Sequence, residues 1–381
     1  MRGPKHEAAQ LNMVAIPRDI AADSVQWDGR QLEVRWKTDI EGYTNHVTKY
    51  SAEYLFDRSV KKSDVGSLRF RVNWNKRKMA ELQHWISFED YMNDDAKFAV
   101  AMRQLSILGM VFVKDIPDSR EMVEKVATRM GPLRNTFYGP TWDVRSVPDA
   151  KNVAYTDKPL EFHMDLLYMN EPPGFQLLHC LQNSCEGGET LFSDTFQVER
   201  RMRNKYPDDA DQLAETELCY EYAHDYANYK NTWPVLNYTE LKNNKILRNV
   251  NYSPPFQGHT STATWRKMME RMRKSPSPLG RFASILKSEQ NVFETKLEPG
   301  QCVIFENRRV AHSRNQFNAS SGQRWLAGAY VDEDALFSQF ARCARDHPEA
   351  WEKTFADITT TSKSVGAAAR EETKEQLDGA K

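Results

Sequence analysis

The stretch that decides the fold spans residues 297–305, Leu297-Glu298-Pro299-Gly300-Gln301-Cys302-Val303-Ile304-Phe305. Its Pro-Gly pair predicts a turn, and the apolar run that follows predicts a buried strand. Similar short apolar segments occur on both sides of it. The pattern predicts further strands at 108–113, 174–180, 190–192 and 325–331.

Helical periods separate and close these strands. They predict helices at 120–131, 196–206, 264–273, 278–288 and 334–347. Many short strands with a few covering helices are typical of a mainly β protein, and we expect a double-stranded β-helix, or jelly roll. We expect three regions: a small β-rich N-terminal domain at 1–90, the jelly-roll catalytic domain at 91–350, and a charged C-terminal tail at 351–381.

Composition limits the function. The 381 residues are 40% hydrophobic and 11% aromatic, with a formal net charge of -1. Such a balanced charge does not favour nucleic acid or an anionic membrane surface as a partner. The N-terminus lacks an apolar signal core, and no apolar run is long enough for a membrane span, so we expect a cytoplasmic protein.

Two histidines and an aspartate suggest a metal site. His163 and Asp165 occur in Phe162-His163-Met164-Asp165, and on a strand positions i and i+2 project to the same face. A distant His312 would complete a two-histidine, one-carboxylate set, which is typical of non-heme Fe(II) oxygenases. Arg324 offers the planar fork that pairs with a dicarboxylate such as 2-oxoglutarate. His163 and Asp165 alone would equally suit an ordinary polar pair at a strand end.

Other segments around these residues carry a family resemblance. The chain resembles the γ-butyrobetaine and trimethyllysine dioxygenases, which belong to the taurine-dioxygenase-like Fe(II)/2-oxoglutarate oxygenases. The similar segments are Asn152-Val153-Ala154-Tyr155-Thr156, Phe162-His163-Met164-Asp165, Pro172-Pro173-Gly174-Phe175-Gln176-Leu177-Leu178-His179-Cys180, Gly187-Gly188-Glu189-Thr190, and Arg324 followed by Gly328-Ala329-Tyr330.

The resemblance implies roles for individual residues. His163, Asp165 and His312 would bind Fe(II), and Arg324 with Thr190 would bind 2-oxoglutarate. With O2 these cofactors would support hydroxylation of a small amine or amino-acid substrate by a homodimeric enzyme, as in carnitine biosynthesis. An aromatic cage for a quaternary ammonium would use four positions, with a polar residue beside them: Tyr138, Trp142, Tyr155, Tyr330 and the polar Asn152.

The chain departs from the family at two places. The butyrobetaine enzymes place a tyrosine directly after the aspartate ligand, where this chain has Leu166; Tyr168 instead matches the spacing of the trimethyllysine enzymes. The family's N-terminal module usually binds zinc through cysteines, but no cysteine precedes Cys180, so we expect no zinc. A partner for a substrate carboxylate is left open among Arg248, Asn249 and Asn251.

Two alternatives therefore remain. The same iron machinery could act on another amino acid or a secondary metabolite by hydroxylation, desaturation or ring closure. A non-catalytic jelly roll could instead use the cage only to hold cations. Residues 224–229 are either a lid or an exposed loop. We expect Arg308, Arg309 and Arg314 to face solvent or a subunit interface, with Arg314 a weaker candidate than Arg324 for 2-oxoglutarate.

Overall fold

The protein is described by a computed structural model over residues 16–351, apart from 41–45, 53–54, 56–69, 146–156, 242–243, 260–269 and 271–275. The chain divides into two compact units, Met1–Asp64 and Val65–Lys381. This division lies earlier than residue 90, where the sequence placed it. The helix expected at 264–273, except for Glu270, and the tail after residue 351 lie outside the described residues.

The N-terminal unit contains an antiparallel three-stranded sheet of β1 (Ala21–Trp27), β2 (Gln31–Thr38) and β3 (Val47–Ser51). Asp28 forms the turn between β1 and β2, because its carboxylate accepts hydrogen bonds from the amides of Arg30 and Gln31. Val34 is buried at the centre of the sheet, and Trp36 donates from Nε1 to Thr48 at 2.8 Å. The β-rich character expected of this unit is confirmed.

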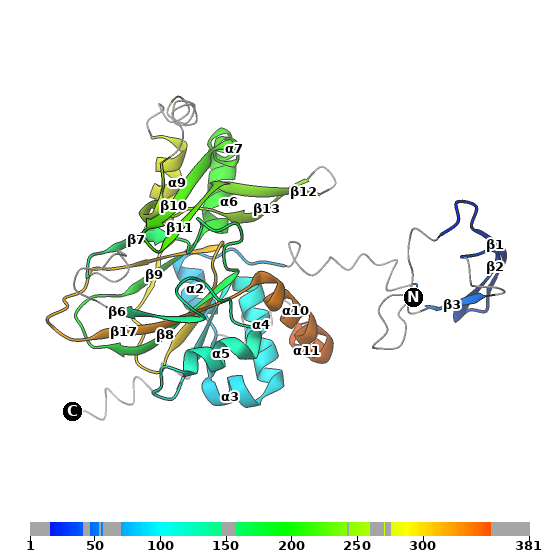
Figure 1. Ribbon diagram of the computed structural model, residues 1–381, viewed down its shortest axis with the longest axis horizontal. Helices are drawn as coiled ribbons and strands as arrows, with labels where there is room; N and C mark the ends of the chain where they lie inside the picture. Colours follow the sequence, from blue (N-terminus) through cyan, green and yellow to red (C-terminus); the bar gives the residue numbers. More distant parts are fainter. Residues whose placement is uncertain are drawn as a thin grey trace. The chain divides into compact units, whose positions relative to one another are not determined.

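Two sheets form the larger unit. Among the described residues, the major sheet has six strands in the order β4-β5-β15-β8-β17-β6, and the minor sheet has four in the order β14-β9-β16-β7. This is the jelly roll that the sequence predicted (Figure 1). The strands are β4 (Trp85–Ser87), β5 (Met110–Lys114), β6 (Thr141–Arg145), β7 (Leu160–His163), β8 (Phe175–Asn183), β9 (Thr190–Asp194), β14 (Phe293–Thr295), β15 (Cys302–Glu306), β16 (Val310–Arg314) and β17 (Arg324–Val331).

The apolar run Cys302-Val303-Ile304-Phe305 forms β15, which is buried on both faces. Val303 and Phe305 point between the two sheets, where Phe305 packs against Phe192 of β9 with ring centroids 5.4 Å apart. Cys302 and Ile304 point to the opposite face. A strand covered on both sides must be apolar at every position, which explains why its sequence shows no alternation.

Helices cover the outer face of the major sheet. Cys302 and Ile304 pack there with Phe98 and Met102 of α4 and Phe340 of α10. Figure 1 shows these helices gathered on one side of β8 and β17. The helices of this layer are α3 (Phe88–Asn93), α4 (Asp95–Leu108), α5 (Met122–Met130), α10 (Glu333–Asp346) and α11 (Pro348–Trp351); α2 (Lys76–Leu82) instead packs with the core between the sheets.

A further set of elements connects β9 to the later strands, and most of its strands were not predicted. Two antiparallel hairpins, β10-β11 and β12-β13, pack with α6, α7 and α9 around a second core (upper part of Figure 1). The elements are α6 (Thr195–Lys205), α7 (Pro207–Glu215), β10 (Glu217–His224), β11 (Ala227–Pro234), β12 (Leu236–Leu241), β13 (Asn244–Val250), the short 3-10 helix η3 (Pro254–Phe256) and α9 (Pro278–Leu286). Across the described residues, no helix has the length and apolar character needed to cross a membrane.

Candidate metal centre and active site

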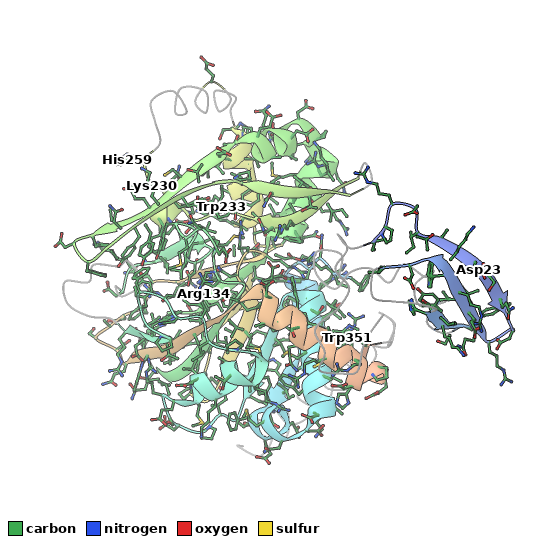
Figure 2. The ribbon with its side chains drawn as sticks, turned by 45° about the vertical axis from the view of Figure 1, so that its right-hand side comes forward. Asp23, Arg134, Lys230, Trp233, His259 and Trp351 are labelled. Atoms are coloured by element: carbon green, nitrogen blue, oxygen red, sulfur yellow. The ribbon has the colours of Figure 1, made fainter. Side chains whose placement is uncertain are left out.

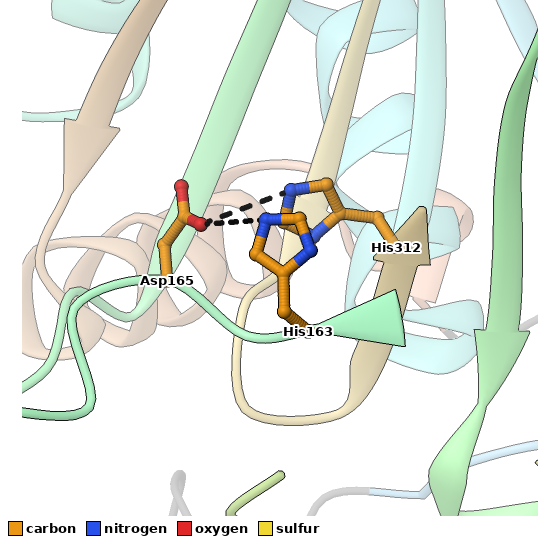
Figure 3. A group of neighbouring side chains, drawn as sticks. All are labelled: His163, Asp165 and His312. Atoms are coloured by element: carbon orange, nitrogen blue, oxygen red, sulfur yellow. Dashed lines mark ion pairs between the residues drawn. The ribbon is translucent and has the colours of Figure 1, made fainter. Parts of the chain in front are cut away.

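Strand pairing brings the two histidines together. β7 and β16 are antiparallel neighbours, and His312 lies opposite His163 in their register. Asp165 follows two residues after His163. Its Oδ1 lies 3.2 Å from Nε2 of His163 and 3.9 Å from Nε2 of His312 (Figure 3). One ligand atom from each side chain falls within 4.8 Å of the others, so the three residues could hold one metal ion.

The protonation of these groups also suits a metal. Nδ1 of His163 donates to the carbonyl of Glu161 at 2.8 Å, which leaves the Nε2 lone pair on the side of Asp165. Burial, followed by the neighbouring His163, lowers the pKa of His312 to about 3, which keeps its imidazole neutral. Burial acts to raise the pKa of Asp165, but His163, His312 and the Tyr330 hydroxyl lower it to about 2. An ionised carboxylate and a neutral imidazole are the forms that bind metal, so the residues fit Fe(II).

Tyr330 links this centre to an aromatic wall. Its hydroxyl donates to Oδ2 of Asp165 at 2.6 Å, and its ring centroid lies 5.2 Å from that of Trp142. Trp142 lies across Gly328, where an added Cβ would come within 2.3 Å of the indole. Glycine at 328 is therefore required by the close approach of Trp142 to the backbone of β17.

Asp165 is also held through its backbone. Asn307 accepts from the Asp165 amide at 2.8 Å and donates to the Asp165 carbonyl at 2.9 Å. The next residue, Leu166, is buried and has a φ of 59°. This left-handed conformation lies about 1–2 kcal/mol above the right-handed one for a residue with a side chain. Sequence reasoning missed Asn307, because its partner lies 142 residues away in the chain.

Arg324 begins β17 and is 9% exposed. Among the described residues, its Nε has no hydrogen-bond partner. Burial lowers the pKa of Arg324. Gly187 and Gly188 both have positive φ, and an added Cβ at Gly188 would approach Nε of Arg324 to 3.4 Å. The Gly-Gly turn thus runs beside the guanidinium stem, and Thr190 follows it as the buried first residue of β9. A buried cation with an unsatisfied donor fits a bound carboxylate such as that of 2-oxoglutarate.

Arg314 differs from Arg324 in its contacts. Its Nη2 donates to the carbonyl of Lys158 at 2.6 Å, whereas both guanidinium groups lie near the Phe317 ring, at 5.0 Å for Arg314 and 5.7 Å for Arg324. Arg314 is 5% exposed and Arg309 is fully buried. The expectation that these arginines face solvent or a subunit interface is therefore wrong for both. Arg309 is enclosed by Asp194 and by the carbonyls of Ile107 and Val72, which come from distant parts of the chain.

The other expected pocket residues belong to one aromatic cluster. The Tyr138 ring lies 6.1 Å from that of Tyr222, and burial, followed by the neighbouring Tyr168, raises the pKa of Tyr138. Tyr168 packs against Phe256 with ring centroids 5.7 Å apart. Phe256 in turn lies 6.4 Å from the ring of His163, which places the cluster beside the metal centre. Tyr222 and Phe256 were not predicted, since neither lies near the motifs in the sequence.

Some expected residues are not in this cluster. Asn152 and Tyr155 lie outside the described residues. Asn251 is fully buried and binds the guanidinium of Arg308, while Asn249 accepts a hydrogen bond from Asn237 at 3.2 Å. Arg248 is exposed. Asn249 and Asn251 are thus engaged within the protein, and the partner of a substrate carboxylate stays a prediction.

Residues 224–229 form the tip of the β10-β11 hairpin. The Tyr226 side chain is 60% exposed, yet its hydroxyl lies 2.6 Å from that of Tyr222. The segment therefore contacts the aromatic cluster at one end and solvent at the other. This position is compatible with either the lid or the loop that the sequence left open.

Comparison with known proteins agrees with this geometry. The family model for taurine catabolism dioxygenases, TauD and TfdA, matches residues 77–330. The chain belongs to this family. As a TauD/TfdA member, it is an Fe(II)- and 2-oxoglutarate-dependent dioxygenase that uses O2. Membership and the His-Asp-His cluster favour an enzyme over a non-catalytic cation-binding protein.

Several curated TauD/TfdA relatives match most of the chain. Dioxygenase str8 of Strobilurus tenacellus is 30% identical over 342 residues, covering 85% of this chain and 77% of that protein. Gamma-butyrobetaine dioxygenase of Homo sapiens is 27% identical over 343 residues, covering 87% and 84%. The mitochondrial trimethyllysine dioxygenase of Homo sapiens is 29% identical over 339 residues, covering 88% and 77%. The last two are the enzymes that the sequence motifs resemble.

Proposed function

We propose that this dioxygenase hydroxylates a small amine-bearing carboxylic acid of the γ-butyrobetaine or trimethyllysine type. The observation that carries the proposal is the double role of Tyr330. Its hydroxyl binds Asp165 while its ring packs on Trp142, so the candidate metal ligands and the aromatic wall meet at one residue. A cation held on that wall would lie beside the metal centre.

Separate residues would bind the metal and the co-substrate. His163, Asp165 and His312 would hold Fe(II). Arg324 would pair with the distal carboxylate of 2-oxoglutarate, with the Thr190 hydroxyl beside it. Bound Fe(II) would supply the O2 chemistry that converts 2-oxoglutarate to succinate and CO2 and places one oxygen atom on the substrate.

The protein contributes orientation and exclusion of water. Ring faces attract an alkylammonium group through the aromatic quadrupole, by about 0.5–1 kcal/mol at exposed sites and about 2 when desolvated. Tyr138, Trp142 and Tyr330 provide such rings, and Tyr168 closes the cluster behind Tyr138. Because both histidines are buried, the reacting C–H bond would be held in a site with little bulk water.

A second candidate function keeps the same machinery with a different substrate. Leu166 replaces one aromatic wall of the butyrobetaine enzymes, and Asn249 and Asn251 are already bound within the protein. These two observations favour an amino acid or secondary metabolite that is not a trimethylated carboxylate. The enzyme would hydroxylate, desaturate or cyclise such a substrate. The relative from Strobilurus tenacellus is named only as a dioxygenase, without a substrate.

One screen separates the two candidates. Purified protein would be incubated with Fe(II), 2-oxoglutarate and O2 together with γ-butyrobetaine, trimethyllysine or ordinary amino acids, and succinate and product mass would be measured. The first candidate predicts a gain of one oxygen atom on a trimethylated amine. Turnover restricted to other compounds, or a loss of two hydrogens, would favour the second. His163→Ala should abolish substrate-dependent succinate formation in either case, and full activity would contradict the ligand assignment.

Location, pathway and assembly are part of the same proposal. The resemblance supports a homodimer, the sequence supports a cytoplasmic enzyme, and the butyrobetaine and trimethyllysine relatives support a role in carnitine biosynthesis. Light scattering on purified full-length protein would test the dimer: a mass of twice 44.1 kDa is expected.

A further inference from the structure

We infer that Asn307 is a positioning residue for the metal centre, and that it fixes the backbone of Asp165 so that the carboxylate faces the two histidines. This inference rests on the proposed function of the His163, Asp165 and His312 cluster. Asn307 lies in the turn between β15 and β16, five residues before His312. It is fully buried.

All the hydrogen bonds of the Asn307 side chain go to the segment around Asp165. Its Oδ1 accepts from the Asp165 amide at 2.8 Å. Its Nδ2 donates to the Asp165 carbonyl at 2.9 Å and to the Pro173 carbonyl at 3.0 Å. The side-chain amide of Asn307 therefore pairs with both the backbone N–H and the backbone C=O of Asp165, as a neighbouring strand would.

Such a brace is needed because β7 ends at His163. Asp165 lies beyond the last strand residue, and no strand pairing holds it. Directly afterwards, Leu166 has a left-handed φ of 59°. A residue outside the sheet and next to a strained one would move readily, and a small movement of its backbone would carry the carboxylate away from His163 and His312.

The rest of the segment is held by two half-buried side chains. Nε1 of Trp233 donates to the Leu167 carbonyl at 2.8 Å, and Nδ2 of Asn231 donates to the Met169 carbonyl at 2.9 Å. Both come from β11, in the upper green part of the molecule, where Trp233 is labelled in Figure 2. These contacts hold the chain after Leu166, whereas Asn307 acts on the ligand itself.

The turn that holds Asn307 leads directly into the strand that holds His312. The turn joins β15 to β16, and β16 carries His312 to its place opposite His163. Asn307 therefore sets the position of Asp165 relative to the strand that supplies the second histidine. Removing a residue that hydrogen-bonds to a metal ligand typically lowers the metal affinity by about 10- to 100-fold.

The test is metal affinity measured without turnover. Full-length protein freed of metal would be titrated with Mn(II), and the free ion would be followed by electron paramagnetic resonance. Asn307→Ala should raise the Kd for Mn(II) by about 10- to 100-fold. The matched control is Asn291→Ala, since Asn291 is 1% exposed and donates to the Ile285 carbonyl at 2.7 Å. That control should lose comparable thermal stability and change the Kd less than about twofold.

The isosteric Asn307→Asp variant covers the case in which Asn307→Ala does not fold. It keeps the acceptor for the Asp165 amide and loses the donor to the two carbonyls, so its Kd for Mn(II) should also rise. Wild-type affinity in a folded Asn307 variant would overturn the inference, as would an equal loss in Asn291→Ala. Wild-type protein that binds no Mn(II) would instead overturn the proposed metal site.

Discussion

The Tyr330 hydroxyl and the Asp165 carboxylate are joined by a hydrogen bond of 2.6 Å. Tyr330 lies on β17 of the major sheet, and Asp165 follows β7 of the minor sheet. The contact therefore ties the two sheets together at the metal centre. It also means that an aromatic residue expected to touch the substrate is bonded to an expected metal ligand.

Removing that hydroxyl gives the first prediction. Tyr330→Phe keeps the ring against Trp142 but deletes a hydrogen bond to an ionised group, which typically contributes about 1.5–3 kcal/mol. We expect the Kd for Mn(II) to rise by about tenfold or more, as measured by titration. Tyr91→Phe is the control, because Tyr91 is equally buried and donates to the Val126 carbonyl in a different core. An unchanged Kd in Tyr330→Phe would show that the hydroxyl does not support Asp165.

The second prediction separates the two buried arginines. Arg324→Lys should raise the KM for 2-oxoglutarate by about tenfold or more, because a lysine cannot reproduce the two-pronged pairing with a carboxylate. Arg314→Lys should change it by less than about threefold, since its Nη2 already donates to the Lys158 carbonyl. Succinate formation at varied 2-oxoglutarate would measure both. A larger rise in this KM for Arg314→Lys than for Arg324→Lys would instead mean that Arg314 binds the 2-oxoglutarate carboxylate.

The third prediction concerns the wall of the substrate pocket. Gly328→Ala would place a Cβ 2.3 Å from the Trp142 indole, so the ring must move. Overpacking of this kind typically costs about 1–3 kcal/mol. We expect a KM for the amine substrate about tenfold higher or more, with the KM for 2-oxoglutarate unchanged.

A double variant provides the control for this steric argument. Trp142→Phe removes the atoms that the new Cβ would meet, so adding it to Gly328→Ala should recover part of the lost thermal stability. Stability losses that simply add in the double variant would contradict the clash between these two positions.

The fourth prediction concerns stability. Arg309 and Asp194 form an ion pair in which both side chains are fully buried, with Nε and Oδ1 3.3 Å apart. Arg309 also donates to the Val72 and Ile107 carbonyls at 2.9 Å each. Removing one member of such a pair typically costs about 3–5 kcal/mol, because the other charge stays buried.

Arg309→Met should therefore lower the free energy of unfolding by about 3–5 kcal/mol in urea denaturation. The exposed pair of Arg345 and Asp346 offers the comparison: Arg345→Met should change the free energy of unfolding far less, because solvent screens this pair. A loss below about 1 kcal/mol in Arg309→Met would mean that Asp194 is adequately solvated by its remaining amide donors.

Much of the fold could be predicted from local patterns. The helices expected at 196–206 and 334–347 are α6 (Thr195–Lys205) and α10 (Glu333–Asp346). The strand expected at 325–331 is β17, which begins one residue earlier, at Arg324. These elements carry clear apolar periods, which depend only on neighbouring residues. The hairpins β10-β11 and β12-β13 were missed because their strands mix polar and aromatic residues, although Tyr229 and Trp233 of β11 do alternate with polar neighbours.

The sequence predicted those site residues whose side-chain type suits a ligand and whose partner lies nearby in the chain. The two-residue spacing of His163 and Asp165 predicted that they lie close together, but β7 ends at His163, so Asp165 is held by Asn307 and not by a strand. The place of His312 was inferred from residue type, and its pairing opposite His163 needed the structure. Arg309 and Asn307 were misjudged or missed, since charged and amide side chains in a turn are ordinarily solvated. Their partners, Asp194 and Asp165, lie 115 and 142 residues away.

The register between β7 and β16 has a consequence for how the enzyme matures. His312 faces His163 only when these strands pair as they do, and a slip of one residue would turn His312 to the other side of the sheet. Chains with a shifted register would therefore lack the second histidine and bind iron poorly. Binding of Fe(II) at this site would therefore depend on correct pairing of β7 with β16, before any turnover can occur.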